Sequence, residues 1–158
     1  MPEMKLPGPE HPITIAANPR VVAVTYQGHQ IANSEAALTL KEATYPPVQY
    51  LPRSDVAMSF LRRTDRVTYC PYKGEAHYFS LFMDGKFAEN AVWTYEDPYP
   101  AMEAIRDHLA FYPNQVQIEE LGVARHASDA AILHTDAGDG ASQQEHWPAN
   151  VSEPNPID

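Results

Sequence analysis

The stretch at residues 76–95, AHYFSLFMDGKFAENAVWTY, decides the fold. Asp84-Gly85 in its middle is one of the strongest short-range signals for a two-residue hairpin turn, since both residue types accept the positive φ that such a turn requires. The apolar and aromatic residues on either side predict two antiparallel strands, 76–83 and 86–95. Alternation along the second strand places five residues on one face, which we expect to be core or the wall of a pocket. They are Phe87, Glu89, Ala91, Trp93 and Tyr95.

Shorter strand patterns lie on both sides of this hairpin. Residues 21–26 and 30–33 flank Gln27-Gly28-His29 and predict another hairpin, in which glycine supplies the positive φ. Because most strands follow one another through short turns, the sequence predicts an α+β, mainly antiparallel domain with a barrel-like or strongly curved sheet. A doubly wound parallel sheet is not expected, since the chain has neither a GxGxxG turn nor a Walker loop. Further strands are expected at 37–43, 48–51, 66–70 and 115–121.

Two short helices complete the predicted secondary structure. Ser54 or Asp55 can cap a first helix that ends near Thr64. Asp97 can cap a second helix, with a proline in its first turn. This helix carries apolar residues at helical spacing, namely Met102, Ile105 and Leu109.

The chain divides into three parts by composition. Its 158 residues are the size of one domain. We expect residues 1–12 to be an extended N-terminal arm and residues 13–121 to be a single globular domain. Residues 122–158 are rich in small and acidic residues and predict a poorly ordered acidic tail. With one basic and six acidic residues, this tail carries a net charge of −5 out of the −10 of the whole chain.

Charge and hydropathy exclude several classes of protein. No apolar run approaches the roughly 18 residues that span a bilayer. The first residues, MPEMKLPGPEHP, lack the pattern of a signal peptide, so we expect a cytoplasmic protein without membrane partners. The net charge of −10 disfavours nucleic acid as a partner, because Lys and Arg drive binding to phosphate backbones. The seven histidines show no pairing typical of a metal site, so no metal is expected.

A set of motifs spread along the predicted domain resembles a known family. The motifs are Lys41-Glu42, Tyr45-Pro46-Pro47, Tyr50, Cys70-Pro71-Tyr72-Lys73-Gly74, Asn90-Ala91-Val92-Trp93-Thr94-Tyr95, Pro98 and Phe111-Tyr112-Pro113. In this order they resemble the domain of unknown function 427 family over about residues 13–121. The resemblance implies a compact, strand-rich single domain. The family also carries a nucleotidyltransferase-like label, but the chain has no Asp-x-Asp and no Gly-Ser to hold magnesium and a triphosphate, so we do not expect that activity.

Candidate catalytic residues gather in or near the stretch 68–81, TYCPYKGEAHYFSL. Cys70, the only cysteine, is a candidate nucleophile, and the positive charge of Lys73 would lower the pKa of its thiol. Glu42 is a candidate acid or base with Lys73 as its partner, and His77 is a candidate base. The alternative is structural: Cys70 is a small buried residue, Cys-Pro-x-Lys-Gly is ordinary turn chemistry, and His77 points outward.

Aromatic residues supply the candidate ligand-binding set, which consists of Tyr45, Tyr50, Tyr72, Trp93 and Tyr95. They would stack on a planar ligand while their polar atoms orient it, or they would fill the core of a small domain. The leading prediction is a small-molecule-binding domain for an anionic or planar ligand, with no cofactor identified. The alternatives are a transferase or hydrolase that uses Cys70, and a non-enzymatic interaction protein.

Overall fold

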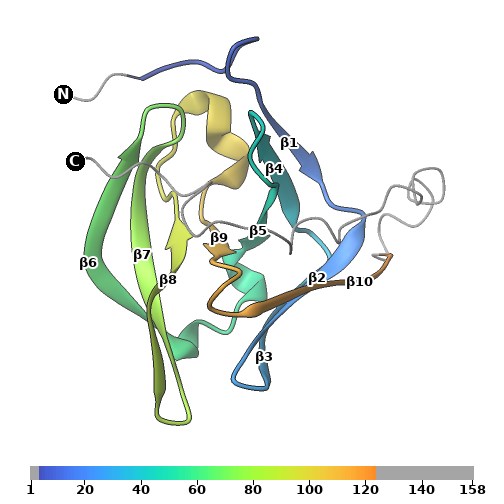
Figure 1. Cartoon of the computed structure of the whole chain (residues 1–158), viewed down its shortest axis with the longest axis vertical. Helices are drawn as coiled ribbons and strands as arrows, with labels where there is room; N and C mark the ends of the chain where they lie inside the picture. The colour runs from blue at the N-terminus through green and yellow to red at the C-terminus, as the bar shows by residue number, and fades with distance from the viewer. Residues whose placement is uncertain (1–3, 124–158) are drawn as a thin grey trace.

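The computed structural model describes residues 4–123, which form two antiparallel sheets connected by tight turns and three short 3-10 helices (Figure 1). In chain order the strands are β1 (Ile13–Ala17), β2 (Arg20–Tyr26), β3 (His29–Ser34), β4 (Leu38–Glu42), β5 (Val48–Pro52), β6 (Leu61–Cys70), β7 (Gly74–Met83), β8 (Lys86–Thr94), β9 (His108–Phe111) and β10 (Gln117–Val123). The mainly antiparallel β architecture predicted from the sequence is confirmed.

The larger sheet has seven strands in the order β1-β4-β5-β9-β8-β7-β6. Its β7–β8 hairpin turns at Asp84 and Gly85 with φ angles of 51° and 77°. The smaller sheet has the order β10-β2-β3, and its β2–β3 hairpin turns at Gln27 and Gly28 with φ angles of 52° and 79°. Both predicted hairpins are therefore confirmed, and in both the residue before the glycine also adopts a left-handed conformation.

Two core clusters lie on opposite faces of the larger sheet. Neighbours in one strand alternate between them, as Tyr78 and Phe79 do in β7 and Tyr50 and Leu51 do in β5. The first cluster is mostly aliphatic and includes Val22, Val24 and other residues of the smaller sheet, which covers that face. The second cluster is rich in aromatic rings and contains four residues that the sequence singled out, together with Met102 and Ile105 from the segment after β8. The four are Tyr50, Cys70, Trp93 and Tyr95.

The larger sheet curves around the aromatic cluster. Glu42 ends β4 near one edge of the sheet, and Lys73 stands in the turn between β6 and β7 at the other edge. Their side chains nevertheless meet at 2.7 Å, so the two ends of the sheet must turn toward each other. The edges β1 and β6 are not paired with each other, and barrel-like closure is not confirmed.

The two predicted helices are not confirmed. The first is replaced by the 3-10 turns η1 (Arg53–Asp55) and η2 (Met58–Phe60), after which β6 begins at Leu61. The second is the 3-10 segment η3 (Pro100–Ile105), in which Met102 has non-helical backbone angles. Tyr99 is its N-cap residue, and no side chain makes a capping hydrogen bond there. Asp107 then takes a φ of 58°, which reverses the chain into β9. Leu109, assigned to the helix, lies in β9 instead.

Strand β8 departs from the simple alternation that its sequence predicts. Asn90 takes a φ of 51° at a bulge opposite Ser80, and its backbone N–H donates to the Ser80 hydroxyl. Trp93 and Tyr95 are fully buried as expected, with Tyr95 following the strand's last residue. Phe87 is 53% exposed, because the end of the β7–β8 hairpin extends past the body of the sheet (Figure 1).

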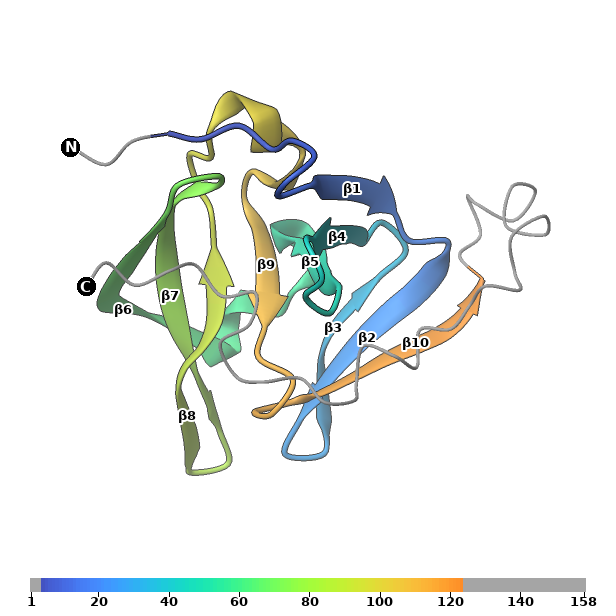
Figure 2. The ribbon, with the colours of Figure 1, turned by 45° about the horizontal axis from the view of Figure 1, so that its top comes forward.

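The N-terminal arm, defined here as residues 4–12, crosses the end of the larger sheet beside η3 and the β6–β7 turn (Figure 2). Its backbone is attached to the rest of the chain where the Lys5 N–H donates to the Pro71 carbonyl and the Ala43 N–H donates to the Pro12 carbonyl. The predicted acidic tail lies outside the described residues from position 124 onward. In the part that is described, no helix has the length and apolar composition needed to cross a membrane.

Candidate functional site

The centre of the aromatic core holds a buried ion pair. The ammonium of Lys73, 1% exposed as a residue, donates to Oε1 of Glu42 at 2.7 Å. Lys73 also lies 5.9 Å from the centroid of the Tyr95 ring, a cation–π contact. The sequence-predicted partnership of Glu42 with Lys73 agrees with this geometry, and Lys41 points outward as strand alternation requires.

The turn that carries Lys73 is built by Gly74. This glycine has a φ of 112°, and a Cβ at this position would lie 3.5 Å from the backbone of Pro98 and Tyr99. The Lys73 N–H donates to the Cys70 carbonyl, and the Lys73 carbonyl accepts from the Tyr99 N–H. The turn is thus held on both sides and directs the lysine side chain inward.

Both members of the pair are charged in the folded protein. Burial by itself raises the pKa of the Glu42 carboxyl, but the positive charge and hydrogen bond of Lys73, with a further hydrogen bond from His11, outweigh it and lower the pKa. Burial by itself lowers the pKa of the Lys73 ammonium, but the acidic groups of Tyr50, Glu42 and Cys70 outweigh it and raise the pKa. A buried carboxylate and a buried ammonium therefore stabilise each other's ionised form.

Aromatic side chains surround this pair. Tyr50, fully buried, accepts a hydrogen bond from the indole Nε1 of Trp93 at 3.1 Å, and their rings meet edge to face. The ring of Tyr112 also packs on Trp93, with ring centroids 4.6 Å apart. Burial raises the pKa of Tyr50 to about 12, against the opposing charge of Lys73, so the phenol keeps its proton at neutral pH.

Cys70 is buried at the end of β6, and its thiol is free. Burial raises the pKa of this thiol, and the opposing charge of Lys73 does not reverse the shift. An activated nucleophile needs a shift in the other direction.

Tyr95 has an unpartnered hydroxyl inside this cluster. Among the described residues, the Tyr95 hydroxyl is the buried side-chain polar atom that has no hydrogen-bond partner. Burial raises the pKa of this phenol well above its usual value, and the nearby acidic groups of Tyr50, Cys70, Tyr78 and Glu42 raise it further. Because buried polar groups in proteins are nearly always hydrogen-bonded, this hydroxyl requires an explanation.

We call Glu42, Tyr50, Cys70, Lys73, Trp93 and Tyr95 the Lys73 cluster. Its outer side is covered by the N-terminal arm. His11 lies with Nε2 2.8 Å from Oε2 of Glu42, and its ring stacks on Tyr72 with centroids 4.2 Å apart and planes 12° apart. His11 was missed from the sequence because its partner is 31 residues away and nothing local marks it.

Two predicted site residues lie apart from the Lys73 cluster. His77 occupies the opposite face of β7 from Tyr78, where its Nε2 is 3.3 Å from the Glu75 carboxylate. Tyr45 is 43% exposed in the turn after β4, where its N–H donates to the Glu42 carbonyl. Tyr72 is half-buried and reaches the cluster through its stack with His11.

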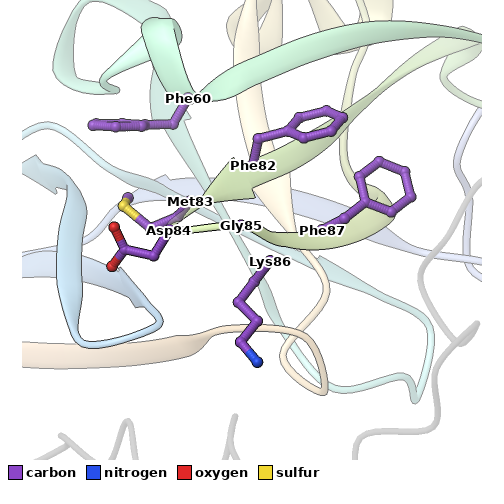
Figure 3. A pocket seen from close by; sticks show the side chains of 7 residues that line it. All are labelled: Phe60, Phe82, Met83, Asp84, Gly85, Lys86 and Phe87. Atoms are coloured by element: carbon purple, nitrogen blue, oxygen red, sulfur yellow. The ribbon is translucent and has the colours of Figure 1, made fainter.

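A separate open groove of about 380 Å³ lies at the tip of the β7–β8 hairpin (Figure 3). The rings of Phe60, Phe82 and Phe87 border it, together with Met83 and Lys86, and no predicted site residue takes part. Among the described residues, no group of three or more His, Cys, Asp or Glu side chains is placed to hold a metal ion.

Comparison with known proteins identifies a family but no activity. A family model described as Domain of unknown function (DUF427) matches residues 14–122. This range runs from the second residue of β1 to the second-to-last residue of β10 and contains all of the Lys73 cluster. No curated protein matches the chain.

Proposed function

We propose a function for this chain from its geometry, since the chain belongs to the domain of unknown function 427 family and that description names no reaction. The proposed function is the binding of a small molecule at the Lys73 cluster. The uncharged phenols and the ion pair offer hydrogen bonds to such a ligand, and the aromatic rings offer stacking surfaces. A cytoplasmic location is part of the proposal and rests on the sequence.

The observation that carries the proposal is the Tyr95 hydroxyl. A buried hydroxyl without a partner costs about 1–3 kcal/mol, and no hydrogen bond within the described residues offsets that cost. Beside it, Lys73 and Glu42 add two buried charges, which are also expensive to keep away from water. Buried polar and charged groups that lower the stability of the free protein are typical of functional sites, where a ligand can interact with them.

The ligand would enter where the arm lies. Residues 4–12 are exposed or half-buried throughout, and His11 is the side chain that joins them to Glu42. A segment with so few buried contacts opens at low free energy. Lifting it would expose the Glu42 carboxylate and the face of Tyr72 without disturbing the strands.

A transferase or hydrolase that uses Cys70 is less well supported. Its nucleophile would need a lowered pKa, whereas burial raises the pKa of this thiol. His77 lies on the other face of β7 and cannot act as its base from there. Binding is therefore the function that the geometry favours.

A thermal-shift measurement with a panel of nucleotides, aromatic acids and N-heterocycles tests the proposal. We expect some of these compounds to raise the melting temperature of the wild type, with a concentration dependence that gives a dissociation constant. Tyr95→Phe should weaken the same compounds by about tenfold, which corresponds to the loss of one hydrogen bond of about 1.4 kcal/mol. Tyr26→Phe, a matched change in the other core cluster, should leave them unaffected.

Two results would overturn the proposal. One is a panel that gives no concentration-dependent stabilisation of the wild type. The other is a set of binding compounds whose affinity is the same for the wild type and for Tyr95→Phe, which would place binding elsewhere.

A further inference from the structure

Two contacts hold the imidazole ring of His11 in place, and a small molecule with a similar ring could make the same two contacts. Its ring lies parallel to the ring of Tyr72, with centroids 4.2 Å apart. Its Nε2 meets Oε2 of Glu42 at 2.8 Å. His11 of the arm thus covers the face of the Tyr72 ring and hydrogen-bonds to the neighbouring carboxylate of Glu42.

The direction of the hydrogen bond at Nε2 follows from the state of Glu42. The carboxylate accepts from Lys73 through Oε1, and an ionised carboxylate has no proton to donate. Nε2 of His11 therefore carries the hydrogen and donates to Oε2. Any group that replaced this ring would have to supply an N–H donor in the same plane.

The charges around the site also limit the class of ligand. Lys73 is already matched by Glu42 on its inner side, so its positive charge is not free to attract an anion. The group presented to the arm is the second oxygen of Glu42, which is an acceptor with negative charge. An anionic ligand would meet this oxygen with like charge, whereas a neutral or cationic N–H donor would complement it.

We infer that the ligand of the Lys73 cluster carries a planar N–H-bearing heteroaromatic ring of the imidazole or aminopyrimidine class, which displaces the His11 ring, stacks on Tyr72 and donates to Glu42, while the rest of the ligand reaches the Tyr95 hydroxyl. The inference rests on the proposed function, since it identifies the chemistry of the ligand at that same site. It also selects between the two ligand types expected from the sequence, planar or anionic, in favour of the planar donor. His11 then acts as a built-in competitor that holds the site closed until such a compound is present.

The attachment of the arm is consistent with displacement. Leu6 is 68% exposed and Met4 46% exposed, so the arm buries little apolar surface against the domain. Its turn is closed on itself by paired backbone hydrogen bonds between Gly8 and His11. The arm can therefore move as a unit that retains its own hydrogen bonds while His11 leaves Tyr72.

Removal of the competitor gives a direct test on the full chain. We would titrate His11→Ala and the wild type with imidazole, with thiazole as a ring of similar size without N–H, and with benzoate as a planar anion. The dissociation constant would be read from chemical-shift changes and from the melting temperature. We expect His11→Ala to bind imidazole at least tenfold more tightly than the wild type does, and more tightly than it binds thiazole or benzoate.

Two variants control this measurement. His29 pairs with Asp84 through Nε2 at 2.9 Å in an exposed position, and no aromatic ring among the described residues stacks on it. His29→Ala should therefore gain no affinity for imidazole. Adding Tyr72→Ala to His11→Ala should weaken imidazole binding about fivefold relative to His11→Ala alone, since the ring on which imidazole stacks is lost. Should His11→Ala fail to fold, displacement is followed in the wild type as a change in the ring resonances of His11 and Tyr72 during the imidazole titration.

The outcomes separate the ligand class from the function. Tighter binding of benzoate than of imidazole by His11→Ala would overturn the inferred class and leave small-molecule binding at the site intact. Equal affinity for imidazole and thiazole would overturn the donation to Glu42. The absence of binding by every probe would also overturn the inference, and the proposed function would then stand or fall by the separate panel with Tyr95→Phe.

Discussion

The ammonium of Lys73 and the carboxylate of Glu42 lie 2.7 Å apart, although Glu42 ends β4 near one edge of a seven-stranded sheet and Lys73 stands in the β6–β7 turn at the other edge. This contact joins the two ends of the sheet where no backbone ladder does. It also determines the electrostatics of the aromatic core, because the phenols and the thiol around it are all neutral acids beside one buried cation. Stability and binding therefore depend on the same two residues.

Removing one partner of this pair should be strongly destabilising. Glu42→Gln leaves the Lys73 ammonium buried without its counter-charge, and such changes cost about 3–5 kcal/mol. Replacing both residues, as in Glu42→Leu with Lys73→Met, should recover most of that loss, because no uncompensated charge remains. Urea unfolding measures both values. Glu96→Gln, which breaks an exposed pair with Arg63, is the control and should change stability far less.

A double variant as unstable as Glu42→Gln alone would contradict this account. It would mean that the shape of the two side chains, rather than their charge, holds the ends of the sheet together.

The stability of the protein should fall in acid through Glu42. The folded-state pKa of this carboxyl is lowered from its ordinary value of 4.5. A lowered pKa gives stabilisation that is fully present above the ordinary value and is lost as the pH falls through the folded-state value. We expect the difference in unfolding free energy between the wild type and Glu42→Gln to be constant from pH 6 to 8 and to shrink below about pH 4.5. A difference that stays constant in acid would show that Glu42 is not ionised in the fold.

Local turn chemistry explains which parts of the fold could be predicted from the sequence. Gly28, Asp84 and Gly85 adopt the positive φ angles that their residue types accept, and both hairpins form as predicted. β9 was missed because Leu109 continues the helical spacing of Met102 and Ile105. Asp107 separates η3 from β9 by taking a positive φ, and no local sequence pattern indicates that the chain reverses there.

The sequence predicted those residues of the candidate site that are close together in the chain. It did not predict the contact between His11 and Glu42, which are far apart in the chain. Cys70, Lys73 and Tyr72 lie within four residues and come together in one turn. His11 joins Glu42 across 31 residues, so its role depends on how the arm crosses the finished sheet. His77 could not be excluded from sequence, because its face of β7 is determined by pairing with Val67 and Thr94.

The hydroxyl of Tyr95 should lower the stability of the free protein. Tyr95→Phe removes a buried oxygen that has no partner and leaves the ring in place, so we expect a gain of about 1 kcal/mol in unfolding free energy. Tyr50→Phe makes the same chemical change to a hydroxyl that accepts from Trp93, and it should lose about 1 kcal/mol. A loss of stability in Tyr95→Phe would show that the hydroxyl has a partner in solution.

The thiol of Cys70 should react slowly in the native state. It is buried, and burial raises its pKa, so both access and the thiolate fraction are reduced. We expect alkylation by iodoacetamide at pH 8 to be on the order of 100-fold slower than in urea, since an opening free energy of about 2.7 kcal/mol gives that factor. A native rate close to that of the unfolded chain would instead support the accessible nucleophile considered from the sequence.

The residue after Glu42 offers a way to stabilise the site without touching it. Ala43 has a φ of 52°, and the left-handed conformation costs a non-glycine residue about 1–2 kcal/mol. Its N–H donates to the Pro12 carbonyl at 2.7 Å, so this strained position also anchors the end of the arm. Ala43→Gly removes the strain and loses about 0.4–1 kcal/mol through the greater freedom of the unfolded chain, which leaves a net gain of about 0–1.6 kcal/mol. Ala101→Gly, an exposed position in η3 without a positive φ, should only lose stability. If Ala43→Gly were as destabilising as Ala101→Gly in urea unfolding, the left-handed conformation beside Glu42 would not be populated in solution.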